Sequence, residues 1–66
     1  MSMALDAGQR AALLKLKTAC KAEGLSSFTA RTGLHRSTLQ AVLSDTARES
    51  SILMALDRFA KAKPAV

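Results

Sequence analysis

Hydrophobic residues recur at helical spacing in four stretches of the chain, separated by glycine or by short polar runs. Asp6 and Gln9, three residues apart, have the spacing of a capping box and predict where the first helix begins. Gly24 predicts where it ends, because glycine readily takes the backbone conformations that close a helix. The predicted inward-facing residues of this first helix are Ala12, Leu13, Leu16, Ala19 and Cys20.

Residues 26–44 predict two short helices joined by a tight turn. The first covers residues 27–32 with Ser26 as its N-cap, and the second covers residues 36–43. Gly33 supplies the left-handed turn between them. A short Gly-containing turn of this kind is typical of a helix-turn-helix unit, although another small helical hairpin would give a similar pattern. The predicted inward-facing residues are Phe28, Leu34, Leu39, Val42 and Leu43.

A polar connector follows, and then a last helix that ends near Ala62. Thr46 and Glu49 also have capping-box spacing, which predicts a start as early as Ala47. The predicted inward-facing residues are Ile52, Ala55, Leu56, Phe59 and Ala60. Leu53 and Met54 fall outside that face, where a pair of apolar side chains favours a partner surface, most simply in a homodimer.

Composition fits one all-α domain over residues 1–66, with a core over about residues 6–62 and four helices with room for a short fifth turn. The 66 residues include no Trp or Tyr and only three Gly, and 48% of them are hydrophobic. A chain this short buries roughly 60% of its unfolded surface, so a second subunit would help to stabilise it. We expect the terminal segments MSMA and KAKPAV to fray, and the initiating Met1 to begin a complete chain.

Charge favours a polyanionic partner, because ten Lys and Arg against five Asp and Glu give a net charge of +5. Six basic residues and one acid, Glu23, lie between Arg10 and Arg36. A single cysteine, Cys20, suits a reducing cytoplasm and a small buried side chain. No apolar run approaches the roughly 18 to 20 residues of a membrane span, and no signal peptide is visible, so we expect a cytoplasmic protein.

The segment ARTGLHRSTLQAVLS resembles the helix-turn-helix of phage Cro and repressor proteins and of related antidote regulators in toxin–antitoxin modules. The resemblance covers about twenty residues closely and the flanking helices only in pattern. Thr29 departs from it, since that family usually has Ala or Gly there. The resemblance implies a four-helix DNA-binding domain whose helix 36–43 enters the major groove of DNA.

The residues predicted to face most directly outward on that helix are Ser37, Ala41 and Ser44. Gln40 lies at the edge of this face, and Arg36 lies on a flank from which its long side chain can reach forward. These residue types suit base recognition. Arg can hold guanine O6 and N7, Gln can hold adenine N6 and N7, Ser can bond either way, and Ala leaves room for a thymine methyl. The alternative is that these are ordinary exposed helix residues. The candidate base-reading residues are Arg36, Ser37, Gln40 and Ala41.

Phosphate contacts are expected around the motif, because the first amides of helix 27–32 and the loop beyond helix 36–43 usually meet the DNA backbone. His35 is expected to cap a helix or touch a phosphate, since no second histidine or cysteine pair lies at metal-ligand spacing. For Arg31, a phosphate contact and plain exposure are equally compatible with its position. Lys17 and Lys21 share a stripe with Arg10 and Leu14, which is either a phosphate-facing edge or a solvated surface. The candidate phosphate-binding residues are Ser26, Ser27, His35, Ser44, Thr46, Arg48, Lys17 and Lys21.

The sequence therefore predicts a sequence-specific regulator that binds double-stranded DNA, a repressor of phage, plasmid or mobile-element type, acting as a dimer on an inverted repeat. The alternative is a protein-interaction module of the same fold, such as an antidote that neutralises a toxin, or a domain that also binds an effector. An enzyme is disfavoured, because the lone histidine has no supporting carboxylate and 66 residues leave little room for a substrate pocket of about 300 Å³. No Gly-rich phosphate loop or metal constellation is present, so no cofactor is expected.

Overall fold

The computed structural model describes residues 5–62, which form four helices and, within that range, no strand. The helices are α1 (Ala7–Glu23), α2 (Leu25–Thr32), α3 (Arg36–Leu43) and α4 (Glu49–Lys61). The predicted all-α class is confirmed. In residues 5–62 no helix is both long enough and apolar enough to cross a membrane. The fraying predicted for residues 1–4 and 63–66 lies outside the described residues.

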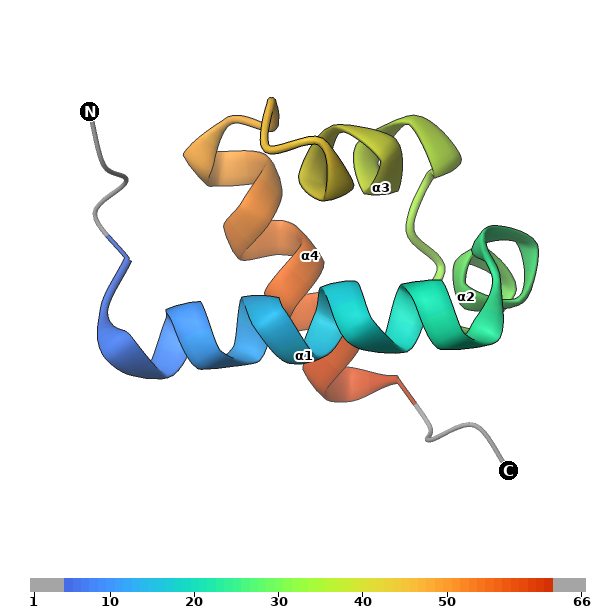
Figure 1. The fold of residues 1–66 in the computed structure, drawn as a ribbon, viewed down its shortest axis with the longest axis horizontal. Coiled ribbons are helices and arrows are strands. Elements are labelled where there is room, and N and C mark those ends of the chain that lie inside the picture. The colour runs from blue at the N-terminus through green and yellow to red at the C-terminus, as the bar shows by residue number, and fades with distance from the viewer. Residues whose placement is uncertain (1–4, 63–66) are drawn as a thin grey trace.

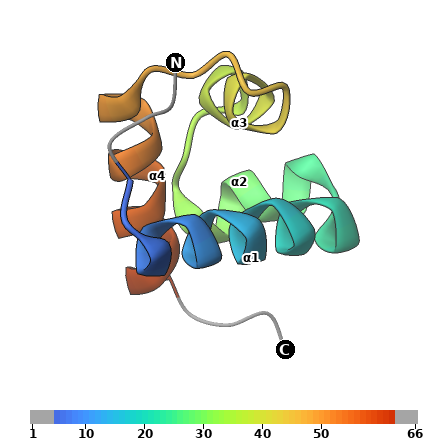
Figure 2. The ribbon, with the colours of Figure 1, turned by 60° about the vertical axis from the view of Figure 1, so that its left-hand side comes forward.

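The long helix α1 and the short helix α3 lie on opposite sides of the molecule, and α4 runs between them (Figure 1). Both α1 and α3 pack against α2 and α4, and α2 also contacts α4. A second view shows α4 standing upright beside α1 and α3 (Figure 2). This arrangement leaves the side of α3 that faces away from α1 uncovered within residues 5–62.

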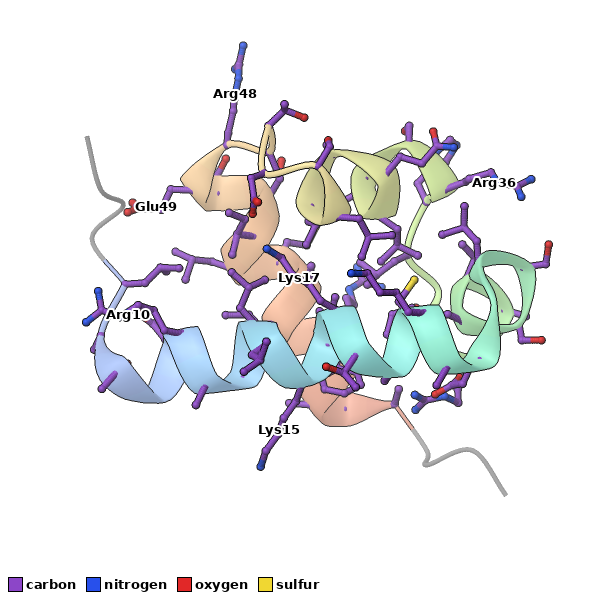
Figure 3. All side chains as sticks on the ribbon, in the orientation of Figure 1. Arg10, Lys15, Lys17, Arg36, Arg48 and Glu49 are labelled. Carbon is purple, nitrogen blue, oxygen red and sulfur yellow. The ribbon has the colours of Figure 1, made fainter. Side chains whose placement is uncertain are left out.

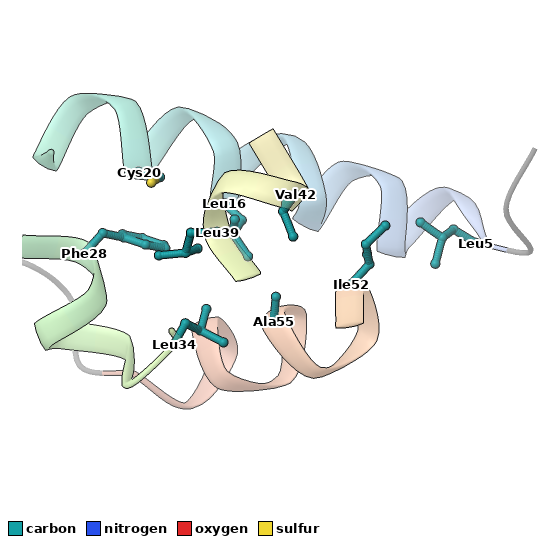
Figure 4. Close-up of a cluster of buried hydrophobic side chains, with 9 residues drawn as sticks. All are labelled: Leu5, Leu16, Cys20, Phe28, Leu34, Leu39, Val42, Ile52 and Ala55. Atoms are coloured by element: carbon teal, nitrogen blue, oxygen red, sulfur yellow. The ribbon is translucent and has the colours of Figure 1, made fainter. Parts of the chain in front are cut away.

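The core lies where the four helices meet (Figure 4). The predicted inward-facing residues that are only partly buried are Ala12, Leu13, Ala19, Leu43, Leu56 and Phe59. The prediction for Ala60 is wrong, because Ala60 lies on the same exposed flank of α4 as Leu53, seven residues earlier. The sequence pattern also missed one core residue that precedes α1. The buried apolar residues are Leu5, Leu16, Cys20, Phe28, Leu34, Leu39, Val42, Ile52 and Ala55.

Cys20 is fully enclosed in this core, as predicted for a small apolar side chain. Burial, and secondarily the Glu23 carboxylate, raise the pKa of its thiol above the usual value. The thiolate form is therefore disfavoured, and the residue packs like a hydrophobe.

The predicted start and end of α1 are confirmed. The Gln9 N–H donates to Asp6 Oδ1 at 2.7 Å, and the Asp6 N–H donates to Gln9 Oε1 at 3.1 Å. Gly24 closes α1 at φ 91° and is also the N-cap of α2. The prediction of Ser26 as that N-cap is wrong, because α2 follows α1 without a loop and Ser26 already lies in its first turn.

The predicted start of α4 is also wrong, since the helix begins at Glu49 with Arg48 at its N-cap. The Thr46 hydroxyl does not cap α4. It lies 2.9 Å from the Ser44 hydroxyl and 3.4 Å from the Ala41 carbonyl oxygen, at the end of α3. Asp57 and Lys61, four residues apart on α4, form an ion pair with 3.2 Å between Oδ2 and Nζ.

The turn between α2 and α3 is held by a buried hydroxyl that the sequence pattern missed. Thr32 Oγ1 donates to the Phe28 carbonyl oxygen at 2.7 Å and accepts the Leu34 N–H at 3.2 Å. Gly33 has φ 75° and ψ 9°, the predicted left-handed conformation, and its N–H donates to the Thr29 carbonyl oxygen at 2.9 Å. The chain can therefore reverse here while Leu34 stays buried.

Arg31 takes neither of the roles expected for it. Its guanidinium donates twice to the Glu23 carboxylate, at 2.9 and 2.6 Å, and so ties α2 to the end of α1. The same group lies 5.2 Å from the ring centroid of Phe28 and 5.8 Å from that of Phe59. The hydrogen bond from Arg31 lowers the pKa of Glu23.

Replacing Gly33 by Ala should lower the free energy of unfolding by about 1 kcal/mol, because an L-residue is strained at this positive φ. Nothing lies within 4 Å of a Cβ built there, so the loss reports backbone strain rather than a clash. Urea denaturation followed by circular dichroism measures it. Gly8→Ala, within α1, is the matched control and should not destabilise the fold. Equal stabilities of Gly33→Ala and the wild type would contradict the strained turn.

Acid should destabilise the wild type more than Glu23→Gln. The pKa of Glu23 is lower in the folded chain than in the unfolded chain. Its contribution to the free energy of unfolding is therefore present above the unfolded pKa and is lost as the pH falls through the folded pKa. Thermal unfolding at several pH values between about 6 and about 3 should show a steeper fall in Tm for the wild type. Parallel curves for the two proteins would assign the acid sensitivity to other carboxylates.

Candidate nucleic-acid interface

The outer face of α3 is polar and open to solvent. Because Leu39 and Val42 are buried, the opposite side of the helix exposes Ser37 and Gln40. Arg36 projects from the first turn of α3, away from the helix bundle (Figure 3). Three of the four candidate base-reading residues are thus exposed together, whereas Ala41 is half-buried.

His35 fixes the start of this helix, which confirms its predicted capping role. It is the N-cap of α3, and its Nδ1 accepts the Ser37 N–H at 3.3 Å. The Ser37 hydroxyl lies 2.8 Å from the same nitrogen. The first exposed turn of α3 therefore has a defined side-chain arrangement before it meets any ligand.

Ser44 and Thr46 close the other end of α3. The Ser44 hydroxyl donates to the Gln40 carbonyl oxygen at 2.9 Å. The Ala41 carbonyl oxygen accepts the N–H of Thr46 at 2.9 Å and that of Ala47 at 3.2 Å. Both hydroxyls remain on exposed residues, but their first role is to hold the loop that leads to α4.

Arg48 lies beyond that loop and projects from the same side of the molecule as α3 (Figure 3). Neither Arg36 nor Arg48 forms an ion pair with another residue in the range 5–62. On this side of the molecule, Arg36 therefore lies in the first turn of α3 and Arg48 at the N-cap of α4.

Lys17 does not stand at a free basic edge, which corrects that part of the predicted phosphate-facing stripe. Its Nζ lies 2.5 Å from Asp45 Oδ1, in the loop after α3. Asp45 has φ 60°, a left-handed conformation that Asp tolerates better than most residues. The ion pair joins α1 to the end of α3, and the remaining lysine of the stripe, Lys21, is exposed in the last turn of α1.

The first turn of α2 offers peptide N–H groups that have no partner within the helix. Ser26 and Ser27 lie in this turn and are exposed, so their backbone and hydroxyl groups are available to an anion. Thr29 is half-buried, and its hydroxyl donates to the Ser26 carbonyl oxygen at 2.8 Å. The Thr29 hydroxyl is therefore hydrogen-bonded within α2 itself.

Acidic side chains largely have structural partners, so the basic excess remains on the surface. Glu23, Asp45 and Asp57 pair with basic residues, and Asp6 caps α1. Lys15 points to the side of α1 opposite α3 (Figure 3), so the positive charge is not confined to the α3 side. In residues 5–62, the basic residues outside ion pairs are Arg10, Lys15, Lys21, Arg36, Arg48 and Arg58.

Leu53 and Met54, the candidate dimer residues, are exposed on α4, with 38% and 44% of their surface accessible. Leu14 is more exposed, at 67%, but lies on the side of α1 that faces away from the core. Two neighbouring apolar side chains on α4 give a small patch, whereas Leu14 stands among the basic residues of α1.

An open groove of about 570 Å³ lies along the end of α2 and the last turns of α4. Substrate pockets usually have a volume of about 300 Å³ or more, and the short chain was expected to leave little room for one. The volume of this groove exceeds that value, so the expectation is wrong. The hydroxyl of Thr32 and the charges of Arg31, Asp57 and Lys61 already have partners. The lining residues are Arg31, Thr32, Asp57, Arg58, Lys61 and Ala62.

The α3 side offers hydrogen-bond donors and acceptors, with Arg36 in the first turn of α3 and Arg48 at the start of α4. Such a surface can pair with the polar edges of bases and with phosphate oxygens. Comparisons of this chain with protein-family models, with curated protein sequences and with solved structures found no match.

Proposed function

We propose that the protein is a sequence-specific double-stranded DNA-binding regulator with a Cro/repressor-like helix-turn-helix. In this proposal α3 enters the major groove and the protein represses transcription by occupying a promoter, as regulators of phage, plasmid or mobile-element type do. The observation that carries the proposal is the exposed polar face of α3, with Arg36 in its first turn and Arg48 on the same side of the molecule at the start of α4. A major groove admits one α-helix, and its base edges match the groups on that face.

Base recognition is assigned to the exposed side chains of α3. Arg36 would hold guanine O6 and N7 with two donors, and Gln40 would hold adenine N6 and N7. Ser37 adds one hydroxyl. The half-buried Ala41 leaves space for a thymine methyl rather than forming a polar contact.

Phosphate contacts would set the orientation of α3 in the groove. Arg48 and the first turn of α2 are the principal groups for this, since both are exposed and neither is needed to close another helix. Lys21 would add charge at longer range, while Lys17 would act indirectly by holding the loop after α3 through Asp45.

Dimerisation is proposed to occur through α4, where Leu53 and Met54 are exposed. A two-fold dimer on an inverted repeat doubles the contacts made by one chain, and its α3 helices would lie about 34 Å apart, one turn of DNA. Such a dimer would also bury apolar surface that a short chain leaves exposed.

Fluorescence-anisotropy titration of DNA from the region upstream of the protein's own gene, against scrambled DNA of equal length, tests the proposal. Binding to the own site should be at least ~1,000-fold tighter, with a steep dependence on salt. Weak and equal binding to both would instead identify a nonspecific cationic domain. Absence of binding would favour the protein-interaction alternative.

Three single alanine variants should separate base contacts from phosphate contacts. Arg36→Ala should lose about 1–3 kcal/mol of binding free energy on the specific site and little on random DNA, because a bidentate base contact is removed. Arg48→Ala should weaken binding to both sequences equally. It should also reduce the slope of log K against log salt concentration by about 1. Lys15→Ala, on the opposite side of α1, is the control and should have a smaller effect than either. Equal losses by Arg36→Ala on both DNAs would remove Arg36 from base reading.

Replacing Met54 by Lys should raise the dissociation constant of the dimer by about tenfold, because it removes the burial of a side chain that is 44% exposed, worth roughly 1 kcal/mol, and brings like charges together. Analytical ultracentrifugation measures this change. Leu14→Lys places the same charge at an apolar residue on the outer side of α1 and should leave self-association unchanged. If both variants sediment like the wild type, the subunit contact lies elsewhere.

A further inference from the structure

Ser37 differs from the other proposed base-reading residues because its side chain is hydrogen-bonded within the described part of the protein. Its hydroxyl oxygen lies 2.8 Å from Nδ1 of His35. Its backbone N–H is directed to the same ring nitrogen at 3.3 Å. Accepting this N–H requires an unprotonated Nδ1, and the corresponding neutral tautomer carries its proton on Nε2.

The direction of the hydroxyl hydrogen bond follows from that tautomer. In the tautomer with an unprotonated Nδ1, the Ser37 O–H donates to that nitrogen. A serine hydroxyl has one proton and two lone pairs, so only acceptor positions remain for a further partner. Ser37 is exposed on α3, so a ligand can reach its hydroxyl oxygen.

We propose that the hydrogen bond between His35 and Ser37 makes Ser37 an acceptor-only reader that selects an amino-bearing base, adenine or cytosine, over guanine or thymine. This inference rests on the proposed function. In the major groove the adenine N6 and cytosine N4 amino groups are donors, whereas guanine O6, guanine N7 and thymine O4 are acceptors. A keto base opposite Ser37 would bring two acceptors together and leave both without a proton to share.

The exposed imidazole also couples this selection to the DNA backbone. With Nδ1 occupied by Ser37, the Nε2–H of His35 is the remaining donor of the ring. A phosphate oxygen accepting from Nε2 requires the proton there, and so would stabilise the tautomer that orients the Ser37 hydroxyl. His35 is therefore a positioning residue for specificity.

The free protein gives the first test, without any DNA. Long-range proton–nitrogen NMR correlation of the single imidazole distinguishes the two neutral tautomers. We expect a protonated Nε2 and an unprotonated Nδ1 at neutral pH in the wild type. The opposite tautomer would overturn the proposal, because the Ser37 hydroxyl would then be free to donate.

Selection from a randomised duplex library gives the second test. The base that faces Ser37 is identified as the position whose preference changes in Ser37→Ala. The wild type should prefer adenine or cytosine there, and removal of that base's exocyclic amino group should weaken binding by about 2- to 12-fold. Ser37→Ala should not respond to this removal. If the base is adenine, replacing its N7 by carbon is the control. This replacement should change the affinity of the wild type and of Ser37→Ala by the same factor.

Two His35 variants test its positioning role. In His35→Ala the Ser37 hydroxyl can donate, so the preference should broaden to include guanine and thymine. His35→Asp retains an N-cap acceptor and should keep the adenine or cytosine preference while binding all DNA more weakly. Circular dichroism checks that both variants keep the helical fold.

The outcomes distinguish this inference from the proposed function. A wild type that enriches a site with guanine or thymine opposite Ser37 overturns the inference alone. So does a His35→Ala variant that keeps the wild-type preference. If no sequence is enriched by the folded wild type, the proposed function fails and the inference fails with it.

Discussion

The turn between α2 and α3 is the constraint on which the rest of this small structure depends. Gly33 takes a left-handed conformation that other residues adopt at a cost, and the buried Thr32 hydroxyl holds both the end of α2 and the N–H of Leu34. Leu34 can therefore enter the core in the middle of a chain reversal. The direction of α3, and with it the set of side chains that face outward, follows from this turn.

Local patterns predicted the helices well because the relevant interactions span only a few residues. The capping box at Asp6 and the left-handed Gly33 are readable from spacing and residue type. The predicted starts of α2 and α4 were wrong where several polar residues competed for one role. Ser26 is a good N-cap by type, but Gly24 already begins the helix. The hydroxyl of Thr46 instead donates to the Ala41 carbonyl oxygen at the end of α3.

Contacts between distant residues could not be predicted in the same way. Lys17 and Asp45 are 28 residues apart, and nothing local indicates that a lysine in a basic stripe would meet the loop after α3. The sequence could indicate which side chains of α3 are exposed, because helical periodicity places them opposite the buried Leu39 and Val42. It could not give hydrogen-bond direction, because the state of the Ser37 hydroxyl depends on which nitrogen of His35 carries a proton.

The proposed dimer links stability to recognition through α4. This helix packs against both α1 and α3, so it supports α3 from within while Leu53 and Met54 are exposed. A partner that binds only the folded chain stabilises it by mass action, and DNA that holds two subunits together acts in the same direction. In a chain of 66 residues, where a single core leaves little reserve stability, the α3 surface would then be most rigid when both subunits and DNA are assembled. Specific sites would gain from that rigidity more than random DNA, because base contacts require a fixed helix and phosphate contacts do not.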